Sequence, residues 1–102
     1  MHKGNISFSQ RVWELTKKIP KGKVTTYKIV AEKLGTRAYR AVGNSLNKNP
    51  YSPIVPCHRV VKSDGSVGGF ASGTKKKVLM LRKEGVTISG NRVNMKKYFL
   101  KI

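Results

Sequence analysis

The first half of the chain carries three stretches whose apolar residues recur with the spacing of a helix. In the first stretch the apolar residues that share one helical face are Phe8, Val12, Leu15 and Ile19. This spacing predicts an amphipathic helix, which Ser7 or Ser9 can cap and which Pro20 ends.

The second stretch repeats the same spacing with Tyr27, Val30, Ala31 and Leu34. Thr25 or Thr26 can cap the helix that it predicts, and Gly35 can end it. An extended link, Lys23-Val24, separates this helix from the first.

The third stretch predicts a helix that Thr36 caps and that runs to about Lys48, before Asn49-Pro50. Its narrow face of small residues consists of Ala38, Ala41, Val42 and Ser45. Two helices joined by a short turn have the layout of a helix-turn-helix, here at about residues 26–48.

The second half begins with an extended segment. Pro53 and Pro56 favour extended backbone up to Val60-Val61. The segment Ser63-Asp64-Gly65-Ser66 then predicts a tight hairpin turn between Val60-Val61 and Val67, because Asp-Gly favours the positive φ values of such turns.

One more helix is predicted after a glycine-rich segment, Gly68–Gly73. Thr74 can cap this helix, which runs to about Lys83 and ends at Gly85. Its inward-facing residues are Val78 and Leu81. The tail, residues 86–102, has mixed polarity and predicts one short strand near residues 87–89.

The chain is short and strongly basic. Its 102 residues predict a single domain, 1–102, and 38% hydrophobic residues suffice for a modest core. Lysine and arginine total 22 against 4 acidic residues, which gives a net charge of +18. A polyanion relieves the self-repulsion of such a chain, so nucleic acid is favoured over an anionic membrane surface as the partner.

Several classes of protein are excluded on simple grounds. We expect no membrane association, because no apolar run approaches the roughly 20 residues of a spanning helix, and we expect a cytoplasmic, nucleoid-associated monomer. One cysteine with His2 and His58 falls short of a zinc site, so no metal is expected. The glycine-rich segment lacks phosphate-loop spacing, which argues against a nucleotide cofactor.

The clearest chemical motif is Pro56-Cys57-His58-Arg59-Val60-Val61, which holds the only cysteine of the chain. A thiol attacks as the thiolate, and an adjacent imidazole or arginine favours that form. A lone cysteine is more often a small buried apolar residue. The motif by itself therefore leaves catalytic and structural roles open.

Several segments in order along the chain resemble the O6-alkylguanine-DNA alkyltransferase family. They are Lys23-Val24-Thr25-Thr26-Tyr27, Arg40-Ala41-Val42-Gly43, Asn49-Pro50, the motif from Pro56 to Val61, and Glu84-Gly85. The resemblance covers most of residues 6–85. It implies a mainly α fold with a small β-hairpin, a winged helix-turn-helix-like alkyltransferase domain that lacks the family's usual N-terminal domain.

The resemblance also implies a reaction and the residues that perform it. Members repair O6-alkylguanine in double-stranded DNA by moving the alkyl group irreversibly onto a cysteine, here Cys57, in a single turnover without a cofactor. His58 takes the thiol proton through a water molecule, and Glu84 orients the imidazole. Tyr27 donates a proton to the departing guanine.

Further roles follow from the same resemblance. Arg40 enters the base stack after the nucleotide flips out. The helix-turn-helix lies in the minor groove, and the remaining DNA-binding residues are Arg37, Ala38, Tyr39 and Ala41. Tyr39 stands where relatives often have a small residue. The pocket for the flipped base involves Val60, Phe70, Ala71 and Ser72, with Phe70 in place of a common tyrosine. Asn49 and Arg59 support the site.

The tail has its own expected role. Its apolar residues around Tyr98 to Ile102 are expected to cover surface that the family's N-terminal domain would bury. A chain truncated after Gly90 that melts like the full chain would refute this.

Two other functions compete with the enzyme. One is an alkyltransferase-like protein that binds the lesion without chemistry, a class that lacks the cysteine. The other is a small basic helix-turn-helix regulator or chromatin protein, in which Cys57 is incidental. Cys57 favours the enzyme over the first, and Tyr27, His58 and Glu84 stay unexplained by the second.

Overall fold

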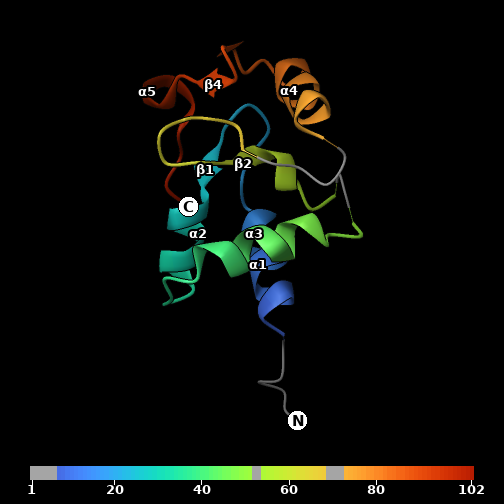
Figure 1. Cartoon of the computed structure of the whole chain (residues 1–102), viewed down its shortest axis with the longest axis vertical. Coiled ribbons are helices and arrows are strands. Elements are labelled where there is room, and N and C mark those ends of the chain that lie inside the picture. The colour runs from blue at the N-terminus through green and yellow to red at the C-terminus, as the bar shows by residue number, and fades with distance from the viewer. Residues whose placement is uncertain (1–6, 52–53, 69–72) are drawn as a thin grey trace.

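The computed structural model describes residues 7–51, 54–68 and 73–102. Helices at one end of the molecule are separated from a helix and a hairpin at the other by a short parallel ladder (Figure 1). The elements in chain order are α1 (Phe8–Thr16), β1 (Thr25–Thr26), α2 (Tyr27–Lys33), α3 (Tyr39–Asn47), the 3-10 helix η1 (Cys57–Arg59), β2 (Val60–Val61), α4 (Thr74–Lys83), β3 (Ile88–Ser89), β4 (Arg92–Val93) and α5 (Met95–Tyr98).

Helix α1 starts at a reciprocal cap. The Ser7 hydroxyl accepts a hydrogen bond from the Gln10 amide, and the Gln10 side chain accepts one from the Ser7 amide, each at 3.1 Å. Ser7, rather than Ser9, is therefore the cap. The helix ends at Thr16, earlier than the apolar spacing predicts. Ile19 lies beyond the helix but is still buried.

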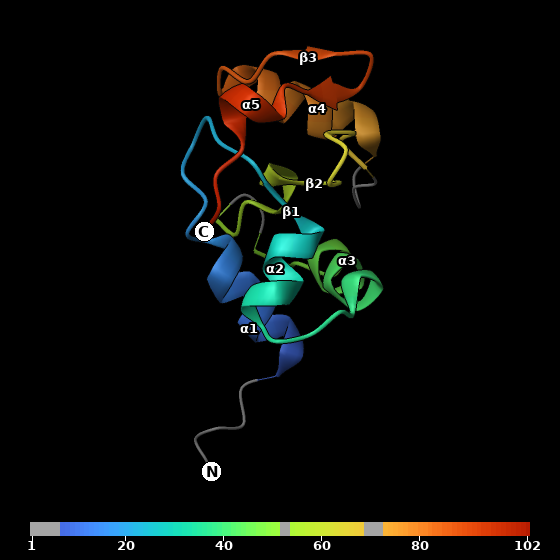
Figure 2. The same cartoon turned by 90° about the vertical axis from the view of Figure 1, so that its left-hand side faces the viewer.

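Helices α2 and α3 form the predicted helix-turn-helix, and they lie side by side below the ladder (Figure 2). Thr26 is the cap of α2, since its hydroxyl accepts from the Ile29 amide at 3.1 Å. The prediction that Thr36 caps α3 is wrong. The Thr36 hydroxyl accepts from the Ala38 amide at 3.1 Å, which makes a local turn and delays the helix start to Tyr39.

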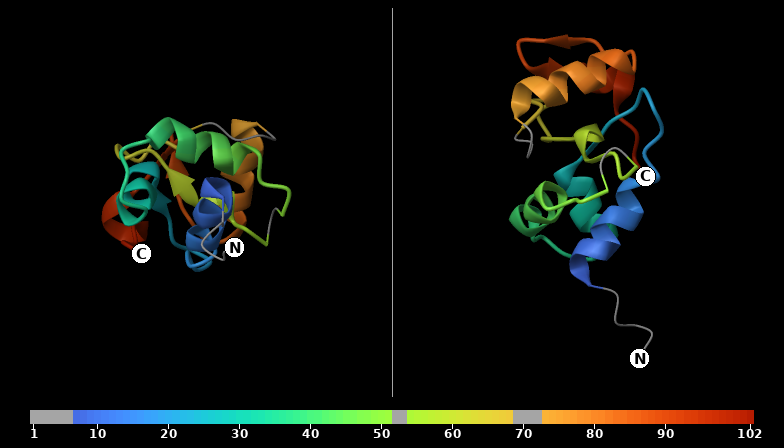
Figure 3. Two further views of the ribbon diagram at one scale, coloured as in Figure 1. Left: turned by 90° about the horizontal axis from the view of Figure 1, so that it is seen from below. Right: turned by 90° about the vertical axis from the view of Figure 1, so that its right-hand side faces the viewer.

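The inward face of α3 differs from the predicted one. Its buried residues are Val42, Ser45 and Leu46, whereas Ala38 is exposed at the N-cap position. Helix α1 packs on this face: the Trp13 indole donates to the Ser45 carbonyl and the Ser9 and Ser45 hydroxyls are bonded, both at 2.8 Å. Figure 3 shows α1 to α3 from below.

The predicted hairpin around Asp64-Gly65 is wrong, although the turn itself is formed. The Gly65 amide donates to the Lys62 carbonyl at 2.9 Å, and Gly65 has a φ of +90°. The strand before the turn pairs elsewhere: β2 forms a parallel ladder with β1, with Thr25 opposite Val60. The hairpin of the fold is β3–β4, which also confirms the strand predicted near residues 87–89.

Helix α4 has the predicted span but not the predicted cap. Gly73, with a φ of +98°, is its N-cap, and Thr74 is the first helical residue. The Thr74 hydroxyl donates to the Gly68 carbonyl at 3.4 Å instead of capping the helix. Val78 and Leu81 are buried as predicted, and Lys77 is buried beside them.

The buried apolar residues form two clusters. The upper core consists of Val24, Val61, Val67, Val78, Leu81, Val86, Ile88, Val93 and Tyr98. The lower core consists of Val12, Ile19, Val30, Ala31, Val42, Leu46, Cys57 and Val60. Because η1 and β2 contribute to both, the segment that holds Cys57 runs along the boundary between the two cores.

The tail is an integral part of the upper core. Tyr98 is buried, and its hydroxyl donates to the Thr87 hydroxyl at 3.0 Å. The Val24 amide donates to the Tyr98 carbonyl at 2.9 Å, and the Leu100 amide donates to the Val24 carbonyl at 2.8 Å. The last residues therefore extend the ladder beside β1. In the described part of the chain, no helix is long and apolar enough to cross a membrane.

Candidate functional site

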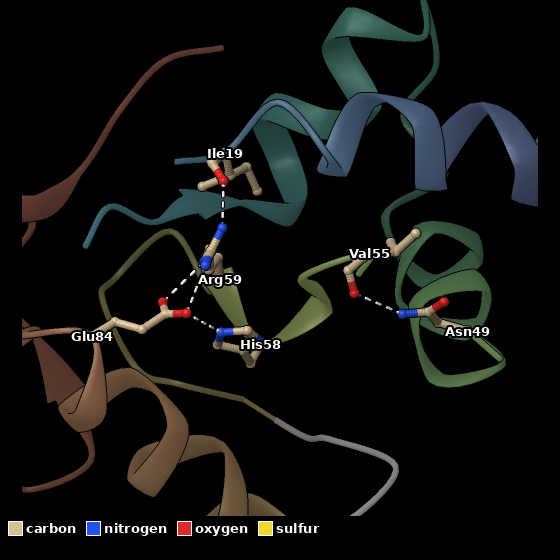
Figure 4. Close-up of polar contacts among 6 residues, drawn as sticks. All are labelled: Ile19, Asn49, Val55, His58, Arg59 and Glu84. Atoms are coloured by element: carbon tan, nitrogen blue, oxygen red, sulfur yellow. Dashed lines mark hydrogen bonds and ion pairs between the residues drawn. The ribbon is translucent and has the colours of Figure 1, made fainter. Parts of the chain in front are cut away.

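Cys57 is the first residue of η1 and lies almost entirely inside the protein. Its residue is 6% exposed, and its amide donates to the Val55 carbonyl at 2.8 Å. The same carbonyl accepts a hydrogen bond from the Asn49 side chain at 2.9 Å, and Asn49 follows α3 directly (Figure 4). Asn49 thus connects the helix-turn-helix to the backbone that presents Cys57.

His58 and Glu84 meet although 26 residues separate them in the sequence. The His58 Nε2 and Glu84 Oε2 atoms are 3.0 Å apart, and the His58 residue is 2% exposed (Figure 4). A carboxylate only accepts, so Nε2 carries the hydrogen and Nδ1 is the basic nitrogen of the neutral ring. Nδ1 is buried and has no hydrogen-bond partner among the described residues.

Arg59 makes the most polar contacts around the site. Its guanidinium donates to both oxygens of Glu84, from Nε at 2.9 Å and from Nη2 at 2.6 Å. Its Nη1 atom donates to the Ile19 carbonyl at 2.7 Å, just beyond α1. The bidentate pair fixes the carboxylate plane that His58 meets. The sequence indicated only backbone contacts for Arg59 and missed this ion pair.

These surroundings shift the pKa values of both partners downward. Burial lowers the pKa of His58, and the hydrogen bond to Glu84 offsets only part of that effect. Burial raises the pKa of Glu84, but hydrogen bonds from Arg59 and His58 outweigh it and bring the pKa below its usual value. At neutral pH the site therefore holds a neutral imidazole against an ionised carboxylate.

A hollow of about 480 Å³ lies between α2, α3 and the segment after β2. Its lining residues are Tyr27, Lys28, Tyr39, Arg40, Gly43, Asn44, Asn47, Lys62 and Ser63. The structure thus brings Tyr27 together with Arg40 and Tyr39. A side chain at Gly68, which has a φ of +75°, would place its Cβ 3.3 Å from the Tyr27 hydroxyl oxygen, so the backbone approaches this tyrosine closely.

Not every predicted site residue is near this hollow. Arg37 is exposed and lines a separate hollow with Glu32. Ala38 is exposed and Ala41 is half-buried at the start of α3. Val60 is fully buried, and its carbonyl accepts from the Lys77 ammonium at 2.7 Å. The predicted pocket residues Phe70, Ala71 and Ser72 lie outside the described residues.

Lys77 is a buried charge near the site that the sequence interpretation missed. Its Nζ atom also donates to the Tyr27 hydroxyl, at 3.2 Å. The available signal was its position: Lys77 precedes Leu81 by four residues and so shares the inward face of α4. Within the described ranges, no three His, Cys, Asp or Glu side chains gather as a metal site would require.

Comparison with known proteins agrees with this geometry. The family model described as 6-O-methylguanine DNA methyltransferase, DNA binding domain, matches residues 7–86. The chain is 47% identical to the methylated-DNA--protein-cysteine methyltransferase of Methanosarcina barkeri over 78 residues, which are 76% of this chain and 49% of the relative. It spans about half the length of most of the curated relatives that it matches.

Solved structures show the same fold. Mycobacterium tuberculosis OGT in complex with DNA matches with a TM-score of 0.74 and 38% identity, over 78% of this chain and 50% of that one. S. pombe Atl1, in complex with damaged DNA that contains O6-carboxymethylguanine, matches with a TM-score of 0.83 and 28% identity over all of both chains. The family model covers most of the chain, so this protein belongs to the O6-alkylguanine-DNA alkyltransferase family.

Proposed function

We propose that this chain repairs DNA by moving the alkyl group of O6-alkylguanine onto its own Cys57. The observation that carries the proposal is the hydrogen bond between His58 and Glu84 directly beside Cys57. It leaves the buried Nδ1 atom of a neutral imidazole as a base in a protein whose single thiol is its neighbour.

The first step is loss of the thiol proton to His58. A 3-10 helix has three residues per turn, so the successive side chains of Cys57 and His58 point about 120° apart. A water molecule between them can pass the proton to Nδ1. Glu84 then stabilises the imidazolium, and Arg59 keeps Glu84 ionised through its bidentate pair.

The second step is the transfer itself. The Cys57 thiolate forms a bond to the alkyl carbon, and the bond from that carbon to O6 of guanine breaks. The electron pair of the broken bond passes into the guanine ring, where a ring nitrogen takes the proton of the Tyr27 hydroxyl. The product thioether does not hydrolyse under these conditions, so each molecule reacts once.

The substrate base has to leave the duplex, because Cys57 is buried. The hollow beside α2 and α3 is the place for it, with Tyr27 in its wall and Arg40 at the helix start. Arg40 takes the position of the flipped base in the stack. The small side chains of Ala38 and Ala41 let α3 approach the minor groove, and the net charge of +18 supplies affinity for phosphates.

The test is to mix the protein with a duplex that contains O6-methylguanine and to weigh the peptide that holds Cys57. We expect a mass gain of one methylene on this peptide, in proportion to the lesion added up to one per molecule. An undamaged duplex and the Cys57→Ser variant should both leave the peptide unchanged. Absence of the mass gain, or equal gain in the variant, contradicts the proposal.

Arg40→Ala is expected to slow repair in duplex DNA about 100-fold or more while slowing transfer from the free alkylated base only slightly, because only the duplex needs a flipped nucleotide. Single-turnover rates on both substrates measure this difference. Arg37→Ala is the matched control, since Arg37 is exposed outside the hollow, and its effect should be confined to DNA affinity. Equal slowing of Arg40→Ala on both substrates would exclude the flipping role.

A second candidate is a lesion-binding protein without transfer. The full-length match to S. pombe Atl1 in complex with damaged DNA favours it. The class described by that resemblance lacks the cysteine, whereas this chain has Cys57 beside His58. In the mass experiment, a stable complex with the O6-methylguanine duplex and an unmodified Cys57 would assign this second function. A small basic regulator would need neither Glu84 nor His58 in this arrangement.

A further inference from the structure

Lys77 is fully buried in the middle of α4, where the helix otherwise presents Val78 and Leu81 to the upper core. Lysine is almost never fully buried without partners, because removal of an ammonium from water is costly. Burial lowers the pKa of Lys77 to about 8, while the nearby Cys57 thiolate acts in the opposite direction. A residue kept in this position therefore has a specific task.

The contacts of Lys77 converge on the proposed reaction centre. Its Nζ atom donates to the Val60 carbonyl at 2.7 Å and to the Tyr27 hydroxyl oxygen at 3.2 Å. The ammonium also lies 5.5 Å from the centre of the Tyr27 ring. Lys77 thus connects α4 to both α2 and the end of η1.

The direction of the hydrogen bond to Tyr27 matters. An ammonium has only donors, so the Tyr27 oxygen accepts and its own hydrogen must point away from Lys77. Tyr27 lines the hollow proposed for the flipped base. Lys77 therefore leaves the Tyr27 hydroxyl hydrogen available for a group in that hollow.

Tyr27 needs such help to act as an acid. Burial raises the pKa of Tyr27, and the charge of the Cys57 thiolate raises it further. Both effects oppose the negative charge that develops on the Tyr27 oxygen when its proton leaves. A cation in hydrogen-bond contact with that oxygen opposes them directly, and its contribution grows as the charge develops.

We propose that Lys77 is a positioning residue for departure of the guanine: it orients the Tyr27 hydroxyl as a donor and stabilises the oxygen as the proton passes to the base. The proposal rests on the alkyl transfer proposed above. As the sulfur–carbon bond forms, negative charge moves from Cys57 through the guanine to the Tyr27 oxygen. Lys77 keeps its protons during this step and lies close to both ends of that movement.

The charged groups around Lys77 allow a different role, which the experiment must separate. Cys57 on η1 and Lys62 after β2 both interact with the ammonium. Lys77 could therefore act by stabilising the thiolate rather than through Tyr27. These two roles differ in what happens when the Tyr27 hydroxyl is absent.

The test is a double-mutant cycle on the single-turnover rate of transfer from an O6-methylguanine duplex. Lys77→Met should slow transfer about 10- to 100-fold in the otherwise unchanged chain, a typical range for loss of assisted proton transfer. In a Tyr27→Phe chain the same substitution should slow transfer less than about twofold, because the hydroxyl through which it acts is gone. Lys77→Arg should restore part of the rate, and Lys76→Met is the exposed control on the same helix.

Each outcome decides the proposal. Equal slowing by Lys77→Met in both backgrounds overturns it, because the effect then passes through the thiolate or the general packing. If circular dichroism shows that Lys77→Met does not fold, Lys77→Gln, which keeps a donor for the Val60 carbonyl without the charge, takes its place in the cycle. An unchanged protein that leaves Cys57 unmodified removes the proposed function and this role together, whereas an active protein with additive substitutions removes this role alone.

Discussion

Replacing Glu84 by glutamine is expected to slow alkyl transfer to Cys57 about 100-fold or more at neutral pH, as loss of an oriented general base does elsewhere. The Glu84 carboxylate accepts from His58 and takes both donors of Arg59. Glutamine retains the shape but has one accepting oxygen and no charge. The imidazolium formed from His58 then loses its counter-charge, and Arg59 loses its partner.

The dependence of this rate on pH separates a relay from simple loss of packing. Burial lowers the pKa of His58, so the unchanged site already holds a neutral base at pH 7 and gains little from a higher pH. In the Glu84→Gln variant the solvent must remove the thiol proton, so its rate should rise from pH 7 to pH 9 more steeply. Single-turnover rates across this range measure the difference.

The matched control is Glu14→Gln. Glu14 is an exposed carboxylate on α1, 3.4 Å from Lys17 in a surface pair. Its substitution should leave the rate and the pH profile unchanged, because exposed pairs contribute little. If the Glu84→Gln profile has the same form as that of the unchanged protein, the relay through His58 and Glu84 is not used.

Truncation after Gly90 is expected to abolish cooperative unfolding at 25 °C. The deletion removes Val93 and Tyr98 from the upper core and both backbone hydrogen bonds of Val24. Loss of one large buried aromatic residue alone costs about 3–5 kcal/mol, and small domains have about 5–15 kcal/mol in total. Thermal and urea melts followed by circular dichroism provide the measurement.

Two substitutions at Tyr98 calibrate the truncation. Tyr98→Phe retains the ring and loses only the bond to Thr87, so it should cost about 1 kcal/mol. Tyr98→Ala should cost several times more, and it separates the packing of this ring from the remaining losses. A truncated chain that melts like the full chain would show that the tail contributes nothing to the upper core.

The helices could be predicted because their signals are local. Apolar residues at helical spacing identified α1, α2 and α4, and the Ser7 and Thr26 caps were among the alternatives considered. The wrong caps had the same local appearance: Thr36 and Thr74 each bond another part of the backbone instead. A threonine in front of an apolar stretch does not reveal which of these bonds it will make.

The pairings between distant segments could not be predicted in the same way. Strand β2 pairs with β1 across the helix-turn-helix, although an Asp-Gly turn follows β2 directly. The preference of that turn for positive φ was met at Gly65, but the choice of strand partner depended on burial in both cores. The meeting of His58 with Glu84 was expected only because of the family resemblance, since nothing local connects those residues.

The buried charges divide along the same line. Glu84 attracted notice as one of 4 acidic residues in a basic chain. Lys77 is one of 22 basic residues, so its type carried no signal and only its position on the inward face of α4 distinguished it. Arg59 pairs with Glu84 because burial leaves each charge without another adequate partner.

The boundary between the two cores gives the site a built-in sensitivity to breathing motions. Cys57 and Tyr27 belong to the lower half, whereas Lys77 and Glu84 come from α4 and its end in the upper half. Folded proteins open transiently in units of this size, well below the cost of full unfolding. Any opening that separates the halves disconnects acid, base and nucleophile at once, so that the protein protects its single-use thiol from premature reaction whenever it loosens.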